Sequence, residues 1–482
     1  MVSLRNVAPT HRAMVVAVTV SMVAFLDSTV INLALTAIEH DLGGGLRLQQ
    51  WIVDGYLLTM AAAILPGGSI SDLFGRVAVM RFGLVVFGAG SVLGAVAASG
   101  EVLVAARLIQ GLGAAFLVPG SLALINTVFD KAHQSAAIGV WTAWTGTAFA
   151  LGPLLGGLCV DLLGWRWVFV LSAIPMAAGY ALTFWLCPVS GRVAHARIDI
   201  VGVVLSSVGL AAIVFALIES QRRGWTDLVV GTPAVLGAAA LSGFVSRQRR
   251  SGHPLLPLSL FTARNFAAVN LVTVFVYSAL TLGSLAVVLY AQEIGGYSAT
   301  SAGLATLPIP VMSFVLARRV GRIAARTGPR MFLIAGPALS GLGMILIRLK
   351  DDGFHAMTDL LPGMTVLALG LVLTVTPLTS VALASVPTEH SGLASAVNNA
   401  AARLAALVSI GSMGLITVGA SAAGFADVLK VSAALFVLGS LCAALWISDS
   451  LDGYGPVPCD LATSCRDRPG VQPALAEQSP PQ

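Results

Sequence analysis

Charged residues are scarce in this chain of 482 residues, since Asp, Glu, Lys and Arg together make up only 10% of it. A typical soluble domain carries roughly 25%. Hydrophobic residues reach 57%, and the mean hydropathy is +0.89. So few charges cannot cover soluble domains of this total length with a hydrated surface. The shortage excludes a soluble enzyme, a disordered protein and a nucleic-acid-binding domain, and it predicts a polytopic membrane protein.

The motifs of common enzyme and cofactor sites are also missing. The five cysteines form no Cys-x-x-Cys pair, so neither a zinc site nor a disulfide framework is indicated. No lysine follows a glycine, which excludes an ATP site of the Walker A type, and neither His-Glu-x-x-His nor Gly-x-Ser-x-Gly occurs. We therefore expect no enzyme activity, no bound metal and no cofactor, with any energy for pumping drawn from an ion gradient or a partner.

What the chain does contain is a series of long apolar segments separated by short charged ones. A transmembrane helix needs about 20 mainly apolar residues. Read with that window, the sequence predicts an all-α protein with fourteen spans. The predicted spans are 13–38, 51–68, 79–99, 102–128, 136–160, 166–187, 199–218, 228–246, 266–290, 301–320, 331–348, 360–384, 393–418 and 426–447.

The basic residues predict how these spans are oriented. If the N-terminus is cytoplasmic and the spans alternate, cytoplasmic segments hold 18 Lys and Arg residues and external segments hold 7. This bias follows the positive-inside rule and predicts that both termini are cytoplasmic. Arginine outnumbers lysine 24 to 3, which is typical of a GC-rich bacterial genome. We expect a multi-pass protein of a bacterial cell membrane.

An internal repeat divides the chain. Residues 68–75 carry the pattern Gly-x-Ile-x-Asp-x-x-Gly, and residues 321–328 carry Gly-x-Ile-x-Ala-x-x-Gly at a spacing of 253 residues. Two similar halves are a common plan for transporters. The predicted units are a six-helix bundle in residues 1–190, two inserted helices in 191–255, a second six-helix bundle in 256–447 and a disordered cytoplasmic tail in 448–482.

Two ionisable residues inside the predicted spans are candidates for mechanism. Asp27 lies near the middle of the first span, where an ionised carboxylate costs at least ~2.5–3.5 kcal/mol. Because burial disfavours its charged form, it can take up and release a proton. Arg107 is the only basic residue of the fourth span and needs an anionic partner, for which Asp27 is the best placed. The alternative for both is a fixed structural ion pair.

Further polar residues are candidates for a substrate cavity. Ser28 and Asn32 belong to a polar stripe of the first span that is separate from Asp27, and Gln110 follows Arg107 by one turn. Asp54, near the external end of the second span, is a second titratable or cation-attracting group, or else a solvated helix-end carboxylate. Arg403 in the thirteenth span is more ambiguous, and we favour packing or snorkelling for it.

Two glycine-containing segments suggest moving parts. In residues 68–76, Gly68 and Gly75 permit a tight turn between two helices, while Asp72 and Arg76 provide charges for a cytoplasmic latch. In the fifth span, glycine and proline gather on a helix that can bend and pack closely against another. General glycine richness, with 51 glycines in the chain, explains part of this pattern. The residues of this span are Gly146, Gly152, Pro153, Gly156 and Gly157.

Together these segments resemble the major facilitator superfamily, and within it the fourteen-helix drug:proton antiporters. Residues 26–34, 68–76, 107–113 and 152–157 are similar, in order, to the family's motifs of the first helix, the second loop, the fourth helix and the fifth helix. The resemblance covers about residues 13–447. It implies two six-helix bundles with two inserted central helices, and alternating access between the halves.

The resemblance also implies a function. We expect a proton-coupled antiporter that exports amphipathic drugs or antibiotics and confers resistance, with Asp27 carrying the proton and Arg107 tuning it. Its partners would be a small molecule, protons and membrane lipid, and we expect a monomer. One alternative is a proton-coupled importer of a small metabolite, against which the 152–157 motif argues. Another is a membrane sensor or scaffold that transports nothing.

Overall fold

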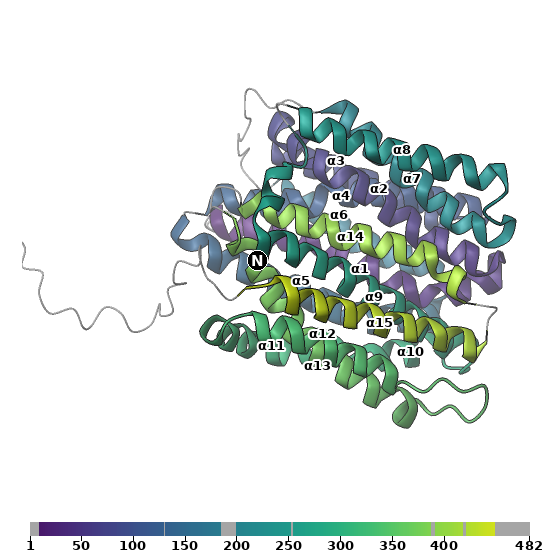
Figure 1. The fold of residues 1–482 in the computed structure, drawn as a ribbon. Helices are drawn as coiled ribbons and strands as arrows, with labels where there is room; N and C mark the ends of the chain where they lie inside the picture. Colours follow the sequence, from purple (N-terminus) through teal and green to yellow (C-terminus); the bar gives the residue numbers. More distant parts are fainter. Residues whose placement is uncertain are drawn as a thin grey trace, which may run out of the picture.

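A computed structural model describes residues 9–129, 131–184, 199–251, 254–386, 391–417 and 421–448. Within these ranges the chain forms helices and no strand, and most helices run roughly parallel or antiparallel in one bundle (Figure 1). This is the arrangement that lipid permits, because a helix satisfies its own backbone hydrogen bonds. Of the tail predicted to be disordered, 448–482, all residues from 449 onwards lie outside the described ranges.

The helices follow one another with short connections. The first half contains α1 (Pro9–Leu42), α2 (Gly45–Phe74), α3 (Arg76–Ala95), α4 (Gly100–Val128), α5 (Lys131–Leu163) and α6 (Arg166–Thr183). Next come α7 (Ile200–Arg223), α8 (Leu228–Arg250) and η2 (Leu258–Thr262). The second half contains α9 (Arg264–Glu293), α10 (Ala299–Thr306), α11 (Pro308–Thr327), α12 (Arg330–Leu346), η3 (Ala356–Leu360), α13 (Leu361–Ala384), α14 (Ser391–Ile416) and α15 (Ala422–Trp446).

Each of the fourteen predicted spans overlaps a helix, and eleven helices in the described ranges are long and apolar enough to cross a membrane. The predicted span 301–320 lies within the candidate span Ala299–Thr327, which consists of α10 and α11 with a break at Leu307. Pro308 is the first residue of α11. The backbone N–H at this position has no partner within a helix, so proline, which lacks an N–H, is well tolerated there. How many helices cross the membrane, and on which side the termini lie, stay predictions.

The two halves repeat the same neighbour relations. The pairs α1–α5, α2–α4 and α3–α6 pack together in the first half, and α9–α14, α11–α13 and α12–α15 pack together in the second. The predicted sequence repeat also has a common backbone geometry. Gly75 and Gly328 have φ angles of 93° and 90° and ψ angles of 133° and 147°. Glycine adopts this region without the Cβ clash that other residues meet, so each half turns at an equivalent residue.

Close helix contacts extend the repeat. A Cβ added at Gly83 of α3 would lie 2.9 Å from the carbonyl oxygen of Gly113 in α4, and one added at Gly336 of α12 would lie 2.9 Å from that of Gly370 in α13. Small residues allow two helix backbones to approach in this way. These contacts match Gly113 with Gly370, 257 residues later, and so align α4 with α13.

Helices α7 and α8 form a hairpin on one side of the bundle (Figure 1). They pack against each other, and α7 also contacts α2 and α14. Before α7, the carboxylate of Asp199 accepts hydrogen bonds from Gly202 N (3.1 Å) and Arg247 Nε (3.2 Å). Burial alone would raise the pKa of Asp199, but these hydrogen bonds and the charge of Arg247 outweigh it and lower the pKa.

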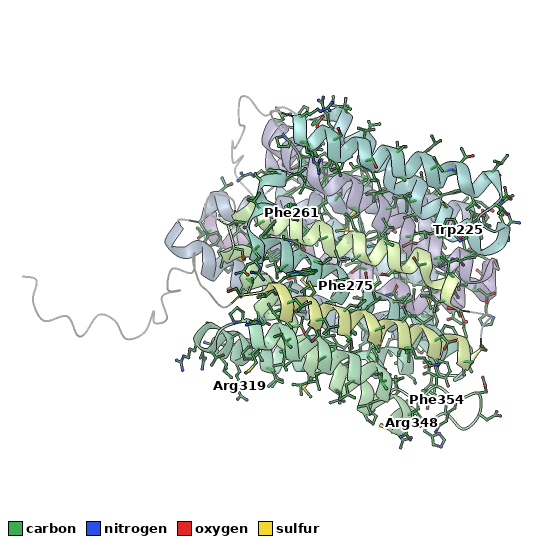
Figure 2. The ribbon with its side chains drawn as sticks, viewed as in Figure 1. Trp225, Phe261, Phe275, Arg319, Arg348 and Phe354 are labelled. Carbon is green, nitrogen blue, oxygen red and sulfur yellow. The ribbon has the colours of Figure 1, made fainter. Side chains whose placement is uncertain are left out.

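The labelled side chains in Figure 2 show which residues lie at each end of the bundle. Trp225, Arg348 and Phe354 lie at one end, and Arg319 lies towards the other (Figure 2). By the predicted topology the first is the external end, because it holds the α7–α8 connection and the loop before α13.

Candidate functional site

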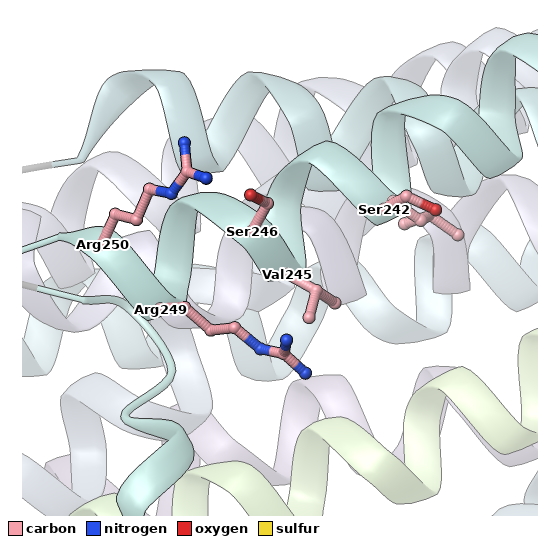
Figure 3. Close-up of a pocket in the computed structure, with 6 residues that line it drawn as sticks. Ser242, Val245, Ser246, Arg249 and Arg250 are labelled. Atoms are coloured by element: carbon pink, nitrogen blue, oxygen red, sulfur yellow. The ribbon is translucent and has the colours of Figure 1, made fainter.

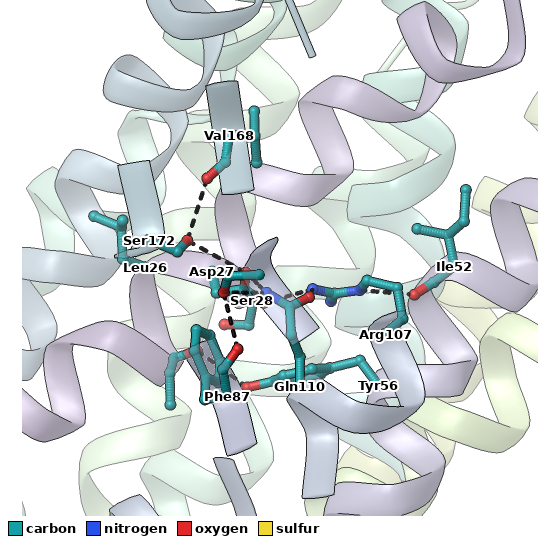
Figure 4. A network of polar contacts seen from close by, with 12 residues as sticks. Leu26, Asp27, Ser28, Ile52, Tyr56, Phe87, Arg107, Gln110, Val168 and Ser172 are labelled. Carbon is teal, nitrogen blue, oxygen red and sulfur yellow. Dashed lines mark hydrogen bonds and ion pairs between the residues drawn. The ribbon is translucent and has the colours of Figure 1, made fainter. Parts of the chain in front are cut away.

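The centre of the first half contains an ion pair that is sealed from solvent. Arg107 Nη1 of α4 lies 2.7 Å from Asp27 Oδ2 of α1, and both side chains have an exposed fraction of 0%. Figure 4 shows the two groups pointing towards each other between their helices. The structure thus brings together the two residues that the sequence analysis gives as candidates for proton coupling.

Other helices orient both members of this pair. Arg107 Nε donates to the carbonyl oxygen of Ile52 in α2 at 3.0 Å, and the guanidinium carbon lies 4.5 Å from the ring centre of Tyr56. Ser172 of α6 donates to Asp27 Oδ1 at 3.3 Å. Four helices of the same half therefore hold the pair, which limits its motion while it is ionised (Figure 4).

Gln110 belongs to this network and not to a substrate cavity as predicted. Its side chain has an exposed fraction of 0%, its Oε1 accepts from Arg107 Nη1 at 2.8 Å, and its Nε2 donates to Ser91 Oγ of α3 at 2.9 Å. A second, longer hydrogen bond runs from Nε2 to Asp27 Oδ1 at 3.4 Å. With both ends of its amide occupied, Gln110 positions the ion pair.

The buried pair has a definite electrostatic character. In a low-dielectric interior, opposite charges in contact attract strongly, and removal of one leaves the other uncompensated at a cost of about 3–5 kcal/mol. Protonation of Asp27 would neutralise the carboxylate and leave Arg107 without its counterion. The ion pair is therefore stabilising only while both charges are present.

The polar stripe of α1 is less uniform than its periodicity suggests. The hydroxyl of Ser28 donates to the carbonyl oxygen of Phe25 in its own helix at 2.8 Å. Asn32 is partly exposed, and its Oδ1 is buried without a hydrogen-bond partner. Of these two candidates for the substrate cavity, Ser28 is therefore bonded within its own helix, whereas Asn32 has a side-chain oxygen without a hydrogen-bond partner.

Asp54 lies inside the bundle, so the interpretation as a solvated helix-end carboxylate is wrong. Its exposed fraction is 0%, and neither carboxylate oxygen has a hydrogen-bond partner. It faces α14, where a Cβ added at Gly411 would lie 3.3 Å from Asp54 Oδ2. One turn earlier, Gln50 Nε2 donates to the carbonyl oxygen of Ile410 at 2.6 Å. Asp54 therefore lies where the two halves meet.

The glycines of α5 pack against neighbouring helices. Gly156 packs against Val30 of α1, and a Cβ added at Gly157 would lie 2.5 Å from Thr300 Cα of α10. Gly303 of α10 in turn packs on the carbonyl oxygen of Pro153. Gly152 contacts Thr29 of α1. The packing of Gly146 lies outside what the structure describes.

A contact that the sequence did not predict closes this interface. The carboxylate of Asp161, one turn beyond Gly157 on α5, accepts hydrogen bonds from the backbone N–H groups of Ala299 (3.0 Å) and Thr300 (2.9 Å). These are the first N–H groups of α10, which a carboxylate satisfies well. The only sign of this contact in the sequence is an acidic residue four positions after Gly157 on the same helix. It joins the two halves at the external end.

The predicted gating loop is shorter than expected. Helix α2 continues to Phe74, so Gly68 is inside a helix and only Gly75 forms the turn before α3. The apolar window ended at residue 68, but the helix continues through polar residues. Arg76 begins α3. The side chain of Asp72 lies outside the described residues, so the proposed latch stays a prediction.

Comparison with known proteins decides the family. The family model described as Major Facilitator Superfamily matches residues 17–410 of the chain. The chain belongs to the Major Facilitator Superfamily. It is therefore a multi-pass membrane protein of a family of carriers, and the two packed halves are the superfamily's fold.

Individual superfamily members and structures agree with this assignment. The chain is 34% identical to the multidrug resistance protein Stp of Mycobacterium tuberculosis over 81% of this chain and 73% of that protein. It is 34% identical to the puromycin resistance protein pur8 of Streptomyces alboniger, over 86% and 83%. A solved POT family transporter in complex with a thioalcohol-conjugated peptide matches with a TM-score of 0.70 and 16% identity, over 89% and 95%. At that identity the match shows the fold alone.

One surface hollow in this superfamily member lies away from the ion pair. It occupies about 500 Å³ on α8 and is lined by Leu241, Ser242, Val245, Ser246, Arg249 and Arg250 (Figure 3). Helix α8 packs mainly against α7, on the side of the bundle. This hollow is not at the interface between the halves, so we do not assign it to transport.

Proposed function

We propose that this protein is a proton-coupled antiporter that exports amphipathic drugs or antibiotics by alternating access. The observation that carries the proposal is the sealed Asp27–Arg107 pair in the middle of one half. The similarity to proteins named for multidrug and puromycin resistance supports export as the direction. The protein would act as a carrier and not as an enzyme, without a cofactor, and as a monomer in the lipid bilayer.

The proposed cycle uses the ion pair as the switch. Proton binding to Asp27 removes its attraction to Arg107, and the guanidinium then relies on Gln110 and the Ile52 carbonyl oxygen. Loss of a strong attraction between α1 and α4 changes the preferred packing of the half. Inward movement of one proton down 100 mV supplies about 2.3 kcal/mol, to which a pH difference adds.

Closure of the external end is the second part of the proposed cycle. Asp161 binds the first N–H groups of α10, and Gln49 Nε2 donates to Glu293 Oε1 of α9 at 2.8 Å. Both contacts join one half to the other at the external end, which fits a state closed to the outside. Alternating access requires that these contacts break when the protein opens outwards.

The proposal is tested in two steps. A resistance panel of acidic, neutral and cationic antibiotics in a pump-deficient host selects a compound against which the wild type protects. That compound is then added to acid-loaded everted vesicles, and the release of protons is measured. Wild type and the surface control Asp427→Asn should release protons, whereas Asp27→Asn should not. Unchanged release in Asp27→Asn would remove Asp27 from the mechanism.

The importer hypothesis is separated by direction. Whole cells that contain the protein should accumulate less of the selected compound than cells without it, whereas an importer would raise accumulation. A sensor or scaffold would move no compound at all. Transport by the purified protein in liposomes, with no other protein present, excludes that class.

A further inference from the structure

Arg403 is a charge that the proposed cycle leaves unused. It lies halfway along α14 and is the only charged residue of that helix. Its side chain is partly exposed, and within the described residues it forms no hydrogen bond and no ion pair. A guanidinium at this depth of a membrane protein is costly unless it has a partner or lines a cavity. The missing partner therefore needs an explanation.

Among the residues that the structure describes, no carboxylate forms an ion pair with Arg403. The helices that pack against α14 include α2, α7 and α9, and the charged residues of α7 and α9 lie at the helix ends. The exception is Asp54 of α2, whose side chain faces Gly411. Gly411 is eight residues beyond Arg403, or about 12 Å further along α14.

Arg403 also faces the space where the two halves meet. Ile410 lies seven residues further along, on nearly the same face of α14, and its carbonyl oxygen accepts a hydrogen bond from Gln50 of α2 in the first half. Snorkelling to a lipid headgroup would turn the guanidinium away from this interface. A partly exposed cation without a partner at such an interface is a group that a ligand can bind.

The Asp27–Arg107 pair cannot serve the same purpose. Both of its side chains are fully buried, each charge is matched by the other, and Gln110 forms a hydrogen bond with each of them. A substrate would have to break this network before it could bind there. Arg403 has no such prior partner.

We propose that Arg403 binds a carboxylate of the exported molecule, so that the preferred substrates are amphipathic acids. The planar guanidinium offers paired N–H donors that match the two oxygens of a carboxylate. This inference rests on the proposed export function and names its substrate class. It also makes the second half the part that recognises substrate, while the first half carries the proton.

The test uses a matched pair of probes. Rhodamine B has a free carboxylate, and its ethyl ester differs only in that the carboxylate is blocked. Binding of each dye to the purified full-length protein in detergent is measured by fluorescence anisotropy. Wild type should bind the acid more tightly than the ester by about tenfold. Arg403→Gln should abolish this preference and leave ester binding unchanged, and Arg403→Lys should keep part of it.

Controls and contrary outcomes are defined by the same measurement. Arg249→Gln on the outer face of α8 should retain the wild-type preference. The proposal is overturned if wild type shows no preference for the acid, or if Arg403→Gln weakens binding of both dyes equally, as a packing role predicts. Because binding needs no gradient, failure of proton-linked transport would contradict the proposed function and leave this result standing.

Discussion

Helices α4 and α13 occupy equivalent places in the two halves but have opposite chemical character. The match of Gly113 with Gly370 aligns Arg107 with Met364 and Gln110 with Leu367. All four of these side chains have an exposed fraction of 0%. One half thus buries an ion pair and an amide where the other half buries two apolar side chains.

The second half is not without buried polar groups. Asn398 of α14 donates to Thr273 Oγ1 of α9 at 2.7 Å and to Asn270 Oδ1 at 3.3 Å. This cluster is neutral, and its hydrogen bonds do not depend on a proton. The comparison indicates that the fold itself needs no buried charge at the centre of a half.

The most severe test replaces Arg107 by its counterpart. Arg107→Met leaves Asp27 buried without a cation, which should lower the free energy of unfolding by about 3–5 kcal/mol and abolish transport. Thermal unfolding in detergent and the vesicle assay measure the two effects. The matched change Met364→Leu should cost less than about 1.5 kcal/mol. Equal losses from the two variants would contradict the asymmetry.

A second test concerns the contact between the halves. Gly157→Leu should hold α5 away from α10, because a Cβ alone would already lie 2.5 Å from Thr300 Cα. Export should fall by about tenfold or more, and a cysteine at position 300 should react faster with an impermeant maleimide from outside. Gly243→Ala, where the nearest atom is 3.7 Å away, is the control. An unchanged labelling rate would mean that this interface does not close the external end.

A milder test exchanges the amide of the network. Gln110→Leu copies Leu367 and removes hydrogen bonds to Ser91 and Arg107. We expect a loss of about 1–3 kcal/mol in unfolding free energy, because the partners stay buried, and partial transport. Leu367→Met in the second half should change neither the free energy of unfolding nor transport. If Gln110→Leu behaves like wild type, then the amide does not position the pair.

The smallest effect is expected in the hairpin that belongs to neither half. Asp199→Ala removes the cap of α7 and should cost about 1 kcal/mol at pH 7. The hydrogen bonds and Arg247 hold the pKa of Asp199 below its usual range in the folded protein. The contribution of the charge is therefore present above the unfolded pKa of about 3.9 and is lost as the pH falls through the lower folded value.

Thermal unfolding against pH checks this last prediction. The difference between wild type and Asp199→Ala should shrink in acid. Asp199→Asn keeps a capping side chain without the charge, so its stability should lack this pH dependence. A difference that stays constant into acid would show that the charge of Asp199 contributes nothing.

Much of the architecture was predictable because lipid imposes long apolar segments. The contact of Asp27 with Arg107 was also predictable, since each is the one candidate partner of the other in its region. Other features depended on neighbours that a single sequence does not display. Gln110 was assigned to a cavity because helical periodicity places it beside Arg107 but does not reveal Ser91 on the next helix.

Two further misses have similar physical causes. The extension of α2 through Gly68 to Phe74 was missed because polar residues at the end of a membrane helix look like a loop. The role of Asp161 was missed because its partners are backbone N–H groups, which every residue except proline possesses. Neither the extension of α2 nor the backbone contact of Asp161 produces a side-chain pattern in the sequence by which it could be recognised.

The way in which Asp161 binds α10 has a consequence for how the gene can vary. Its two oxygens recognise main-chain N–H groups and ignore the side chains at positions 299 and 300. A scan of all substitutions should accordingly find position 161 restricted and position 300, whose side chain is partly exposed, permissive except to proline. The residue at position 300 can then change during evolution while the hydrogen bonds from Asp161 to the backbone of α10 are kept.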